Sequence, residues 1–315
     1  MTYKTGIMAP AGLPPELFRQ FAAEVERSGF AELWVPEDCF LSGGIAQAAV
    51  ALAVTSRIEV GIGIIPAAAR NVAFAAMDLS FLASAFPGRL MIGVGHGMTG
   101  WLRQVGAWPA SPLTLLAEYL DALRALLAGQ VVTRQGQYVR LAGVQLEHPP
   151  AVTPGVLAGV RGPKSLALAG QHADGLILAE PVTPAYLKFV RAQLANAGDL
   201  LIAAYNIAAV RDDQQQAREQ VRDALWWAGD PAWAPELAPL PFAAELASMR
   251  RSAGSAAEFT RQLPGGWIDQ LALTGPPSVV RARLAELHAA GAQHLILAPV
   301  GSDPIGELSQ LARVL

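Results

Sequence analysis

Hydrophobic residues along this chain alternate between short continuous runs and longer stretches in which they recur every three or four residues. Short apolar runs that end at Gly, Pro or charged residues are typical of buried strands, and the longer periodic stretches are typical of helices. Three such runs, at 33–36, 58–65 and 90–94, end in acidic, Gly-rich or polar residues. Two Ala-rich segments of helix length separate them. This order predicts parallel strands with the unusual side chains collected at their carboxyl ends, where ligands bind in parallel α/β folds.

The alternation continues to the end of the chain and predicts eight strands that alternate with helices. The expected strands are 3–8, 33–36, 58–65, 90–95, 156–158, 175–179, 200–210 and 294–298. The expected helices are 14–27, 45–55, 72–86, 113–127, 162–172, 184–197, 213–228, 278–290 and 304–314. The simplest closed arrangement is an α/β fold of the (β/α)8 TIM barrel type, formed as one domain over residues 1–315. A doubly wound open sheet is the alternative.

Two stretches depart from this alternation and are expected to be insertions. Residues 130–150 suggest a hairpin with strands at 131–133 and 138–141, around Gln135 and Gly136. Residues 229–268 are rich in Pro and Trp and suggest short helical pieces. The segment 271–274 either extends this second insertion or lies near the barrel rim.

Composition and charge narrow the class of protein. Hydrophobic residues make up 52% of the chain and charged residues only 16%, which indicates a large core with strands buried on both faces. The net charge of −3 and the pI near 6.0 favour no nucleic-acid partner. No apolar run of about 18 residues indicates a membrane span. The first residues lack the apolar core of a signal peptide, and the lone Cys39 excludes an intramolecular disulfide, so we expect a cytoplasmic protein.

The sequence contains no convincing residues for a zinc site or for a dinucleotide-binding site. The five histidines are scattered without the spacing of a zinc site, so we expect no metal. The sequence from Gly95 to Gly100 matches GxGxxG after a strand, but Gly106 and Pro109 interrupt the helix that a dinucleotide site requires. We therefore reject the dinucleotide interpretation. This loop is either a plain flexible turn or, as we favour, backbone that approaches a flat ligand closely.

Three groups of residues at expected strand ends suggest a site. Glu37 and Asp38 end the second strand, where an acid can exchange a proton or accept hydrogen bonds, although paired loop acids are often merely solvated. Gly63 interrupts the third strand before Ile64 and Ile65, which suggests a bulge or a close backbone approach. Asn71 is a candidate N-cap for the helix that follows.

The turn from Gly159 to Ser165 joins a strand to a helix. Free backbone N–H groups at a helix start, together with Arg161 and Lys164, suit a phosphate, although Gly-rich turns without ligands are common. His96 is either a catalytic donor or an ordinary loop histidine, and chemistry alone favours the ordinary role. Trp101 is expected to serve packing.

Taken together, these motifs resemble the bacterial luciferase-like superfamily of flavin and deazaflavin oxidoreductases. The similarity runs from GFAELWVPED through TSRIEVGIGIIP, FPGRLMIGVGHG and DALRALLAGQVVTRQGQYVRL to GPKSLALAGQHADGLIL and TGPPSVVRARLAELHAAGAQHLILAP. The resemblance implies a (β/α)8 barrel with insertions that binds an isoalloxazine-type ring at its carboxyl end. It also implies a homodimer formed through the helices near 45–55 and 71–86.

Within this superfamily, LWVPEDCFLSGG and GVGHGMTGWLRQVGAWPASPL are most similar to the branch that uses the 5-deazaflavin coenzyme F420, which includes methylenetetrahydromethanopterin reductase. The resemblance implies that Glu37 and Asp38 stand at the position of an acid–histidine pair beside the ring, and that Gly63 and Ile64 form a non-proline cis peptide supporting one ring face. It implies catalytic roles for Glu37 and His96. The implied coenzyme-binding residues are Asp38, Gly63, Ile64, Ile65, Gly95, His96, Gly97, Gly159, Arg161, Gly162, Lys164 and Ser165.

The chain also departs from this branch. Met98 stands where the related sugar-phosphate dehydrogenase has its acidic proton donor, and Asp38 replaces the usual histidine. We expect an F420-dependent oxidoreductase that transfers a hydride to or from a small organic substrate. The alternatives are an FMN-dependent monooxygenase that uses dioxygen, and a barrel that binds a coenzyme without turnover.

Overall fold

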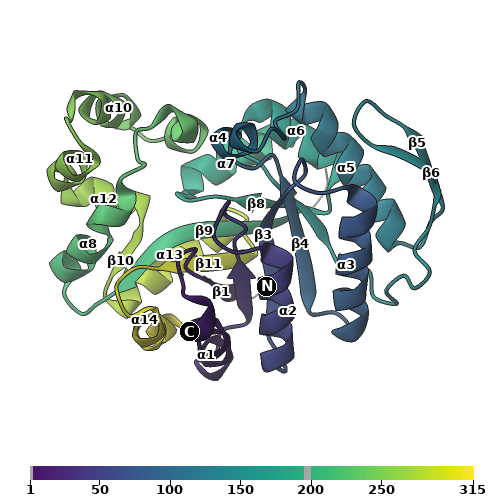
Figure 1. Cartoon of the computed structure of the whole chain (residues 1–315). Helices are drawn as coiled ribbons and strands as arrows, with labels where there is room; N and C mark the ends of the chain where they lie inside the picture. Colours follow the sequence, from purple (N-terminus) through teal and green to yellow (C-terminus); the bar gives the residue numbers. More distant parts are fainter. Residues whose placement is uncertain (1–2, 195–199) are drawn as a thin grey trace.

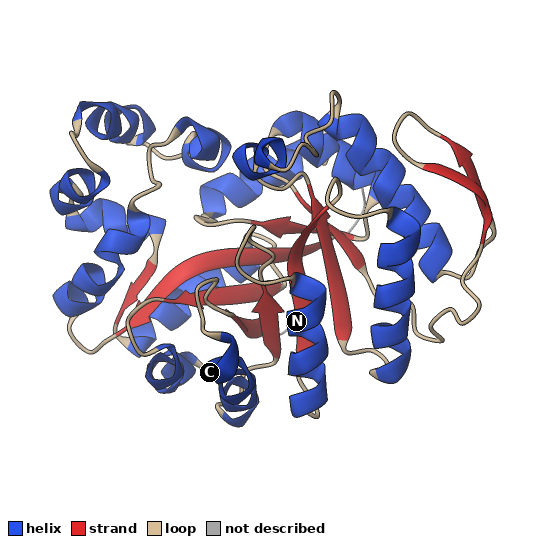
Figure 2. Ribbon diagram, in the orientation of Figure 1, coloured by secondary structure: helices blue, strands red, loops and turns tan. Residues whose placement is uncertain are grey.

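Eight parallel strands close into a barrel in the computed structural model, which describes residues 3–194 and 200–315. The barrel strands are β1 (Lys4–Met8), β2 (Glu32–Val35), β3 (Glu59–Pro66), β4 (Leu90–Gly95), β7 (Val156–Gly159), β8 (Gly175–Leu178), β9 (Leu201–Val210) and β11 (His294–Pro299). Each pairs with the next in parallel, and the β11–β1 and β8–β9 pairings close the ring (Figures 1 and 2). The predicted TIM barrel is confirmed, and the open-sheet alternative is wrong.

Helices cover the outside of the barrel, as expected from the alternation. They are α1 (Pro15–Arg27), α2 (Gly44–Val54), α3 (Val72–Ala85), α5 (Pro112–Leu127), α6 (Pro163–His172), α7 (Pro184–Gln193), α8 (Gln214–Arg222), α13 (Pro277–Ala289) and α14 (Pro304–Leu311). The short α4 (Thr99–Gln104) and the 3₁₀ turns η1 (Asp223–Leu225) and η3 (Ala312–Val314) complete these connections. The predicted end of the helix 184–197 lies partly outside the described residues.

Helix boundaries follow local chemistry. Asn71 caps α3 by accepting a hydrogen bond from the Ala73 N–H at 2.9 Å, which confirms the predicted N-cap. The four-residue spacing of Leu17, Phe21 and Val25 predicts that they share the buried face of α1. Phe21 and Val25 are fully buried, as predicted, but Leu17 is 38% exposed and Phe18, at 6%, is buried in its place.

The first insertion is a hairpin beside α5. The strands β5 (Val132–Gln135) and β6 (Arg140–Val144) pair antiparallel, one to three residues later than predicted. The Glu118 carboxylate of α5 accepts hydrogen bonds from the backbone N–H groups of Gln137, Tyr138 and Val139 at 2.8–2.9 Å. These bonds hold the hairpin turn against the barrel, since they satisfy three backbone donors of the turn.

The second insertion is helical and lies beside the carboxyl-terminal half of β9. Its elements are η2 (Pro231–Trp233), α9 (Ala234–Leu237), α10 (Ala243–Ser252), α11 (Ala256–Gln262) and α12 (Gly265–Leu271), and Figure 1 shows α10–α12 grouped with α8 at one side of the barrel. The strand β10 (Leu273–Gly275) then pairs with β9 outside the ring, near the rim. The Trp227 and Leu246 side chains belong to a separate hydrophobic cluster formed by this segment.

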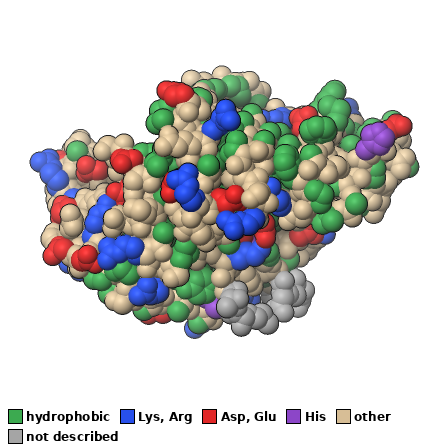
Figure 3. Space-filling model, turned by 90° about the horizontal axis from the view of Figure 1, so that it is seen from below, with side chains coloured by type: hydrophobic (Ala, Val, Ile, Leu, Met, Phe, Trp, Pro, Cys, Tyr) green, Lys and Arg blue, Asp and Glu red, His purple; other side chains and the backbone are tan. Residues whose placement is uncertain are grey.

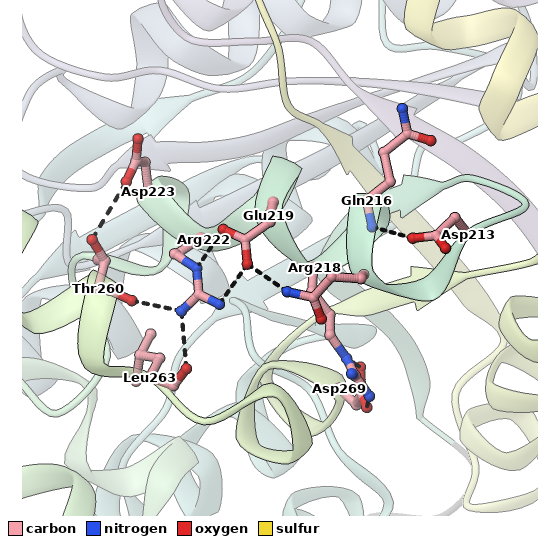
Figure 4. Close-up of polar contacts among 10 residues, drawn as sticks. Asp213, Gln216, Arg218, Glu219, Arg222, Asp223, Thr260, Leu263 and Asp269 are labelled. Carbon is pink, nitrogen blue, oxygen red and sulfur yellow. Dashed lines mark hydrogen bonds and ion pairs between the residues drawn. The ribbon is translucent and has the colours of Figure 1, made fainter.

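Two arginines of α8 fasten the second insertion to the barrel (Figure 4). Arg218 forms an ion pair with Asp269 of α12 at 2.6 Å. Arg222 donates to the carbonyl oxygens of Thr260 and Leu263, both at 2.9 Å. Because Arg222 satisfies backbone carbonyls at the end of α11, it fixes the position of that helix end.

Large side chains fill the lower and middle parts of the barrel. Trp34 is fully buried and meets Tyr205 edge-to-face, with ring centroids 5.8 Å apart. Below them, Glu32 accepts a hydrogen bond from the Trp34 indole at 3.0 Å and contacts the His294 ring. Since these residues occupy the interior, space for a ligand is left at the carboxyl ends of the strands.

The outer surface is divided between charged and apolar regions. Figure 3 shows Lys, Arg, Asp and Glu side chains spread over the left and centre of the face seen from below, and apolar side chains more frequent on the right. Within the described residues, no helix is long and apolar enough to cross a membrane.

Candidate active site

The residue groups singled out by sequence lie on four consecutive barrel strands. Glu37 follows β2, Gly63 and Ile64 lie in β3, His96 follows β4, and the turn beginning at Gly159 follows β7. In the sheet, Pro66 is paired with Gly95, and Gly95 with Gly159, so these carboxyl ends are adjacent. The structure therefore brings these groups to one part of the barrel mouth.

A bulge in β3 forms an apolar platform at this mouth. The Gly63–Ile64 peptide bond is cis, as implied by the resemblance, and the pairing of β3 with β4 shifts between Ile62 and Ile65. A Cβ atom on Gly95 or Gly159 would lie only 2.9 or 2.5 Å from the Ile64 side chain. Ile64 thus lies against strand ends that only glycine can form, and it remains partly exposed at the mouth.

Tyr205 lies directly beneath this platform. A Cβ atom on Gly63 would collide with the Tyr205 hydroxyl. The Tyr205 side chain is 4% exposed, and its hydroxyl has no hydrogen-bond partner among the described residues. Burial raises the pKa of Tyr205, and the charges of Glu32 and Glu180 raise it further, so the phenol stays protonated.

Glu37 is held in an ion pair. Its carboxylate contacts both terminal nitrogens of Arg70, one of them at 3.0 Å, and accepts a hydrogen bond from the Gly44 N–H at 2.8 Å. The Glu37 side chain is 9% exposed. These contacts engage both carboxylate oxygens, so Glu37 anchors the loops after β2 and β3 to each other. Its expected catalytic role remains a prediction.

His96 connects the loop after β4 with the first turn of α6. Its Nε2 lies 3.2 Å from the Ser165 hydroxyl oxygen. Burial lowers the pKa of His96 below its ordinary value, although a hydrogen bond to the Pro112 backbone opposes this shift. The imidazole is therefore neutral at pH 7, and one of its nitrogens can accept a hydrogen bond.

The turn before α6 offers free donors for an anion. Its N-cap residue, Gly162, forms no side-chain cap, so backbone N–H groups of the first turn point outward at the positive end of the helix dipole. Lys164 is exposed in this first turn, and Ser165 is half-buried.

Arg161, expected to help bind the phosphate, is engaged with the second insertion. Its Nε lies 3.1 Å from the Glu236 carboxylate of α9, and its Nη1 donates to the Ala232 carbonyl at 2.9 Å. Its guanidinium also lies over the Trp233 ring, 5.1 Å from the centroid. In the described structure Arg161 therefore joins the turn before α6 to the insertion, and phosphate binding by Arg161 remains a prediction.

Two carboxylic acids near the mouth were missed by sequence reasoning. Glu180 follows β8 immediately after an apolar run, just as Glu37 and Asp38 follow β2, so the same rule applied to the run 175–179 would have found it. Burial raises the pKa of Glu180 and of Asp38. Glu236 is fully buried, and burial raises its pKa to about 7, against the opposing charge of Arg161. No local pattern marks Glu236, because α9 lies within an insertion whose path the sequence did not reveal.

Comparison with known proteins decides the family. The family model described as luciferase-like monooxygenase matches residues 2–294. The chain belongs to this family. It is therefore an enzyme of the oxidoreductase class. It is 26% identical over 298 residues to 5,10-methylenetetrahydromethanopterin reductase of Methanolobus tindarius, covering 91% of this chain and 90% of that protein.

Solved structures share the fold of this luciferase-like chain. The coenzyme F420-dependent tetrahydromethanopterin reductase of Methanopyrus kandleri has a TM-score of 0.86 at 18% identity, covering 100% of this chain and 99% of that one. An F420-dependent secondary alcohol dehydrogenase in complex with an F420–acetone adduct has a TM-score of 0.81 at 20% identity, covering 100% and 98%. The FMN-bound oxygenating constituent of 3,6-diketocamphane monooxygenase of Pseudomonas putida has a TM-score of 0.75 at 17% identity, covering 99% and 97%. These identities support a common fold and do not by themselves assign a coenzyme.

Proposed function

We propose that this enzyme is an F420-dependent oxidoreductase that transfers a hydride between the deazaflavin coenzyme and a small organic substrate. The observation that carries the proposal is the Ile64 platform, which lies against the glycine-lined ends of β4 and β7 next to the uncapped start of α6. Two solved structures named as F420-dependent enzymes share the fold over the whole chain, and one of them is a tetrahydromethanopterin reductase, like the sequence relative matched over nine-tenths of its length; these likenesses favour F420 over FMN.

The residues at the mouth fit a coenzyme with a flat ring and a phosphate. A planar ring needs a flat apolar surface without projecting side chains, and Ile64 with Gly95 and Gly159 provides one. A phosphate needs donors and a positive potential, which Lys164, Ser165 and the N–H groups of the first turn of α6 provide. When bound, the coenzyme supplies the hydride chemistry.

The protein's own contribution is to position the reactants and to exclude water. Ile64 supports one face of the ring, while the loop from Gly95 to Gly97 lies beside its edge. Neutral His96, which is in contact with Ser165, links this loop to the phosphate turn. Holding both reactants in a reactive arrangement removes much of the entropic barrier to a bimolecular reaction.

The second candidate is an FMN-dependent monooxygenase, favoured by the structural similarity to the FMN-bound monooxygenase of Pseudomonas putida. The same phosphate turn suits either coenzyme. The two functions differ in coenzyme preference and in their need for dioxygen.

Fluorescence titration of the full chain with F420 and with FMN tests the proposal. We expect F420 to bind at least tenfold more tightly than FMN, and turnover to proceed without dioxygen. Lys164→Met should weaken F420 binding about tenfold, equivalent to about 1.4 kcal/mol. Lys188→Met, at an exposed position on α7, is the matched control and should leave the affinity unchanged. Tighter FMN binding together with dioxygen-dependent turnover would support the monooxygenase instead.

We also propose that the enzyme is a homodimer formed through α2 and α3. Phe74, Met77 and Phe81 of α3 are 65%, 54% and 73% exposed, and Val50 of α2 is 38% exposed. The three α3 residues recur at helical spacing and so form one apolar stripe. Contiguous exposed apolar surface of this kind is typical of protein–protein interfaces.

A further inference from the structure

Two carboxylic acids follow barrel strands that lie on opposite sides of the ring. Asp38 follows β2 and Glu180 follows β8, and these strands are separated by β3, β4 and β7, so they stand on opposite walls of the eight-stranded ring. The charge of Asp38 nevertheless contributes to the raised pKa of Glu180. The register of β8 with β9, which pairs Leu178 with Ala204, also places Glu180 beside the strand that carries Tyr205.

Glu180 is held on a rigid segment of the rim. The three residues after it, Pro181, Val182 and Thr183, are buried. The Val182 N–H donates to the Asn206 side-chain oxygen at 3.0 Å, and Thr183 caps α7 by accepting from the Tyr186 N–H at 3.1 Å. Both contacts fix the backbone that follows Glu180.

An independent observation points to a polar ligand atom near Glu180. The Tyr205 hydroxyl lies beneath Gly63, is buried and has no partner among the described residues, and its pKa is affected by the charge of Glu180. A buried hydroxyl left without a partner costs about 1–3 kcal/mol. Such a group is expected where a bound molecule supplies the missing hydrogen bond.

The other candidates for proton transfer are occupied or unsuitable. Glu37 is engaged by Arg70 and the Gly44 N–H. His96 is neutral and lies next to Ser165. Met98 carries no ionisable group, and Glu236 is completely buried in the insertion.

We propose that Glu180 is the catalytic acid–base of this enzyme and exchanges a proton with the heteroatom of a substrate carbonyl group, with Asp38 on the opposite wall as a positioning residue. This inference rests on the proposed function. In the reducing direction the substrate carbonyl carbon accepts a hydride, with its two electrons, from the reduced deazaflavin. The carbonyl π bond breaks toward oxygen, and the oxygen takes the proton of Glu180. The products are an alcohol, the oxidised coenzyme and the Glu180 carboxylate, which regains its proton from water.

Electrostatics support this assignment. Burial and the Asp38 carboxylate favour the protonated form of Glu180, while its own backbone and Arg161 favour the charged form, and the net shift of its pKa is upward. The ionisable groups that influence or are influenced by Glu180 are Asp38, Arg161, Tyr205 and Glu236. A general acid works best when its pKa is raised toward the working pH.

Infrared pH titration of the full chain tests the proposal without a substrate. Because Glu236, whose pKa is raised to about 7, would give a similar band, the titration is made in the Glu236→Gln background. In that background we expect a carboxylic-acid C=O band that persists above the usual titration range of glutamic acid, is lost when Glu180→Gln is added and is retained when Asp38→Asn is added. Glu147→Gln, at an exposed position near the hairpin, is the matched control. A band unchanged by Glu180→Gln would overturn the proposal.

Kinetics with acetone and reduced F420 provide the second test. Glu180→Gln should lower kcat by about 10²–10⁴-fold while F420 affinity changes less than threefold, and Glu180→Asp should restore part of kcat with a shifted pH profile. Equal kcat in Glu180→Gln and wild type, or a parallel loss of kcat and F420 affinity, would overturn the catalytic role. Failure of the wild-type chain to bind F420 would refute the proposed function instead, and the infrared titration would still decide whether Glu180 holds the proton.

Discussion

Arg161 and Glu236 form an ion pair that joins the turn before α6 to the second insertion. The Arg161 Nε lies 3.1 Å from a Glu236 carboxylate oxygen, and Glu236 is fully buried. The Tyr186 hydroxyl donates to the Arg161 carbonyl at 3.0 Å and so fixes the arginine's backbone from the opposite side. The pair therefore connects the expected phosphate-binding turn to the segment that covers one side of the mouth.

Removing the arginine should destabilise the fold. Arg161→Met leaves the Glu236 carboxyl buried without its counter-charge, and breaking a buried pair in this way costs about 3–5 kcal/mol. We expect a loss near the lower end of that range, because the Arg161 side chain is 32% exposed. Urea unfolding at pH 8 measures it. Arg103→Met, at an exposed position on α4, should change the free energy of unfolding by less than about 0.5 kcal/mol.

Replacing Glu236 should change how stability depends on pH. The pKa of Glu236 is raised to about 7 in the folded chain from an ordinary value of 4.5. The folded state thus binds this proton more tightly than the unfolded state. The contribution of protonated Glu236 to the free energy of unfolding is therefore complete below pH 4.5 and is lost as the pH rises to about 7. Relative to wild type, Glu236→Gln should become more stable by up to about 3 kcal/mol between pH 5 and pH 8. If the free energies of urea unfolding of wild type and Glu236→Gln changed in parallel from pH 5 to pH 8, the raised pKa of Glu236 would be contradicted.

Removing the Tyr205 hydroxyl should make the fold more stable and the enzyme less active. Tyr205→Phe deletes a buried hydroxyl without a partner, so we expect the free energy of unfolding to rise by about 1 kcal/mol. Tyr119→Phe is the matched control, because the Tyr119 hydroxyl of α5 is likewise buried without a partner. Both variants should melt at a higher temperature, and only Tyr205→Phe should lower turnover. Equal turnover in the two variants would exclude a role for Tyr205 at the mouth.

The Ile64 platform can be tested at a single glycine. A Cβ atom on Gly159 would lie 2.5 Å from Ile64, whereas one on Gly266, in α12, meets no atom within 4 Å. Gly159→Ala should therefore cost about 1–3 kcal/mol and weaken F420 binding at least tenfold. Gly266→Ala should leave the affinity within threefold of wild type. The pair is compared by fluorescence titration, and similar affinities would show that the platform does not support the coenzyme.

The apolar stripe on α3 gives a prediction about assembly. Phe81→Arg places a charge at the most exposed of its three residues and should convert a dimer into a monomer in light scattering. Val279→Arg, at a 43% exposed position on α13, should leave the mass unchanged. A monomeric wild-type chain would contradict the proposed homodimer. A Phe81→Arg variant that remains a dimer would show that the interface does not include this stripe.

The barrel could be predicted because each strand is a continuous apolar run with a polar or Gly-rich end. The run at 90–95 was predicted with its observed bounds, and the bulge at Gly63 follows from a glycine inside a strong strand pattern. On the predicted buried face of α1 only Leu17 was wrong, because both Leu17 and Phe18 are apolar and the periodicity does not choose between them.

The sequence predicted the site residues that stand at strand ends. It did not predict the ion pairs that these residues form with side chains from other elements. The sequence places Glu37 at the mouth but does not reveal that Arg70, from the next strand loop, neutralises it. Likewise, the ion-pair partner of Arg161 is Glu236 of α9, which lies far along the chain. The residues of the turn from Gly159 to Ser165 include no acid, so the sequence suggested that Arg161 binds a phosphate.

The measurement that tests the central claim most directly is a fluorescence titration of the purified full chain with F420 and with FMN, alongside the Gly159→Ala variant. The account predicts saturable binding of F420, at least tenfold tighter than that of FMN and at least tenfold weaker in the variant. Absence of saturable F420 binding by the wild-type chain, or equal affinity in Gly159→Ala, would contradict it.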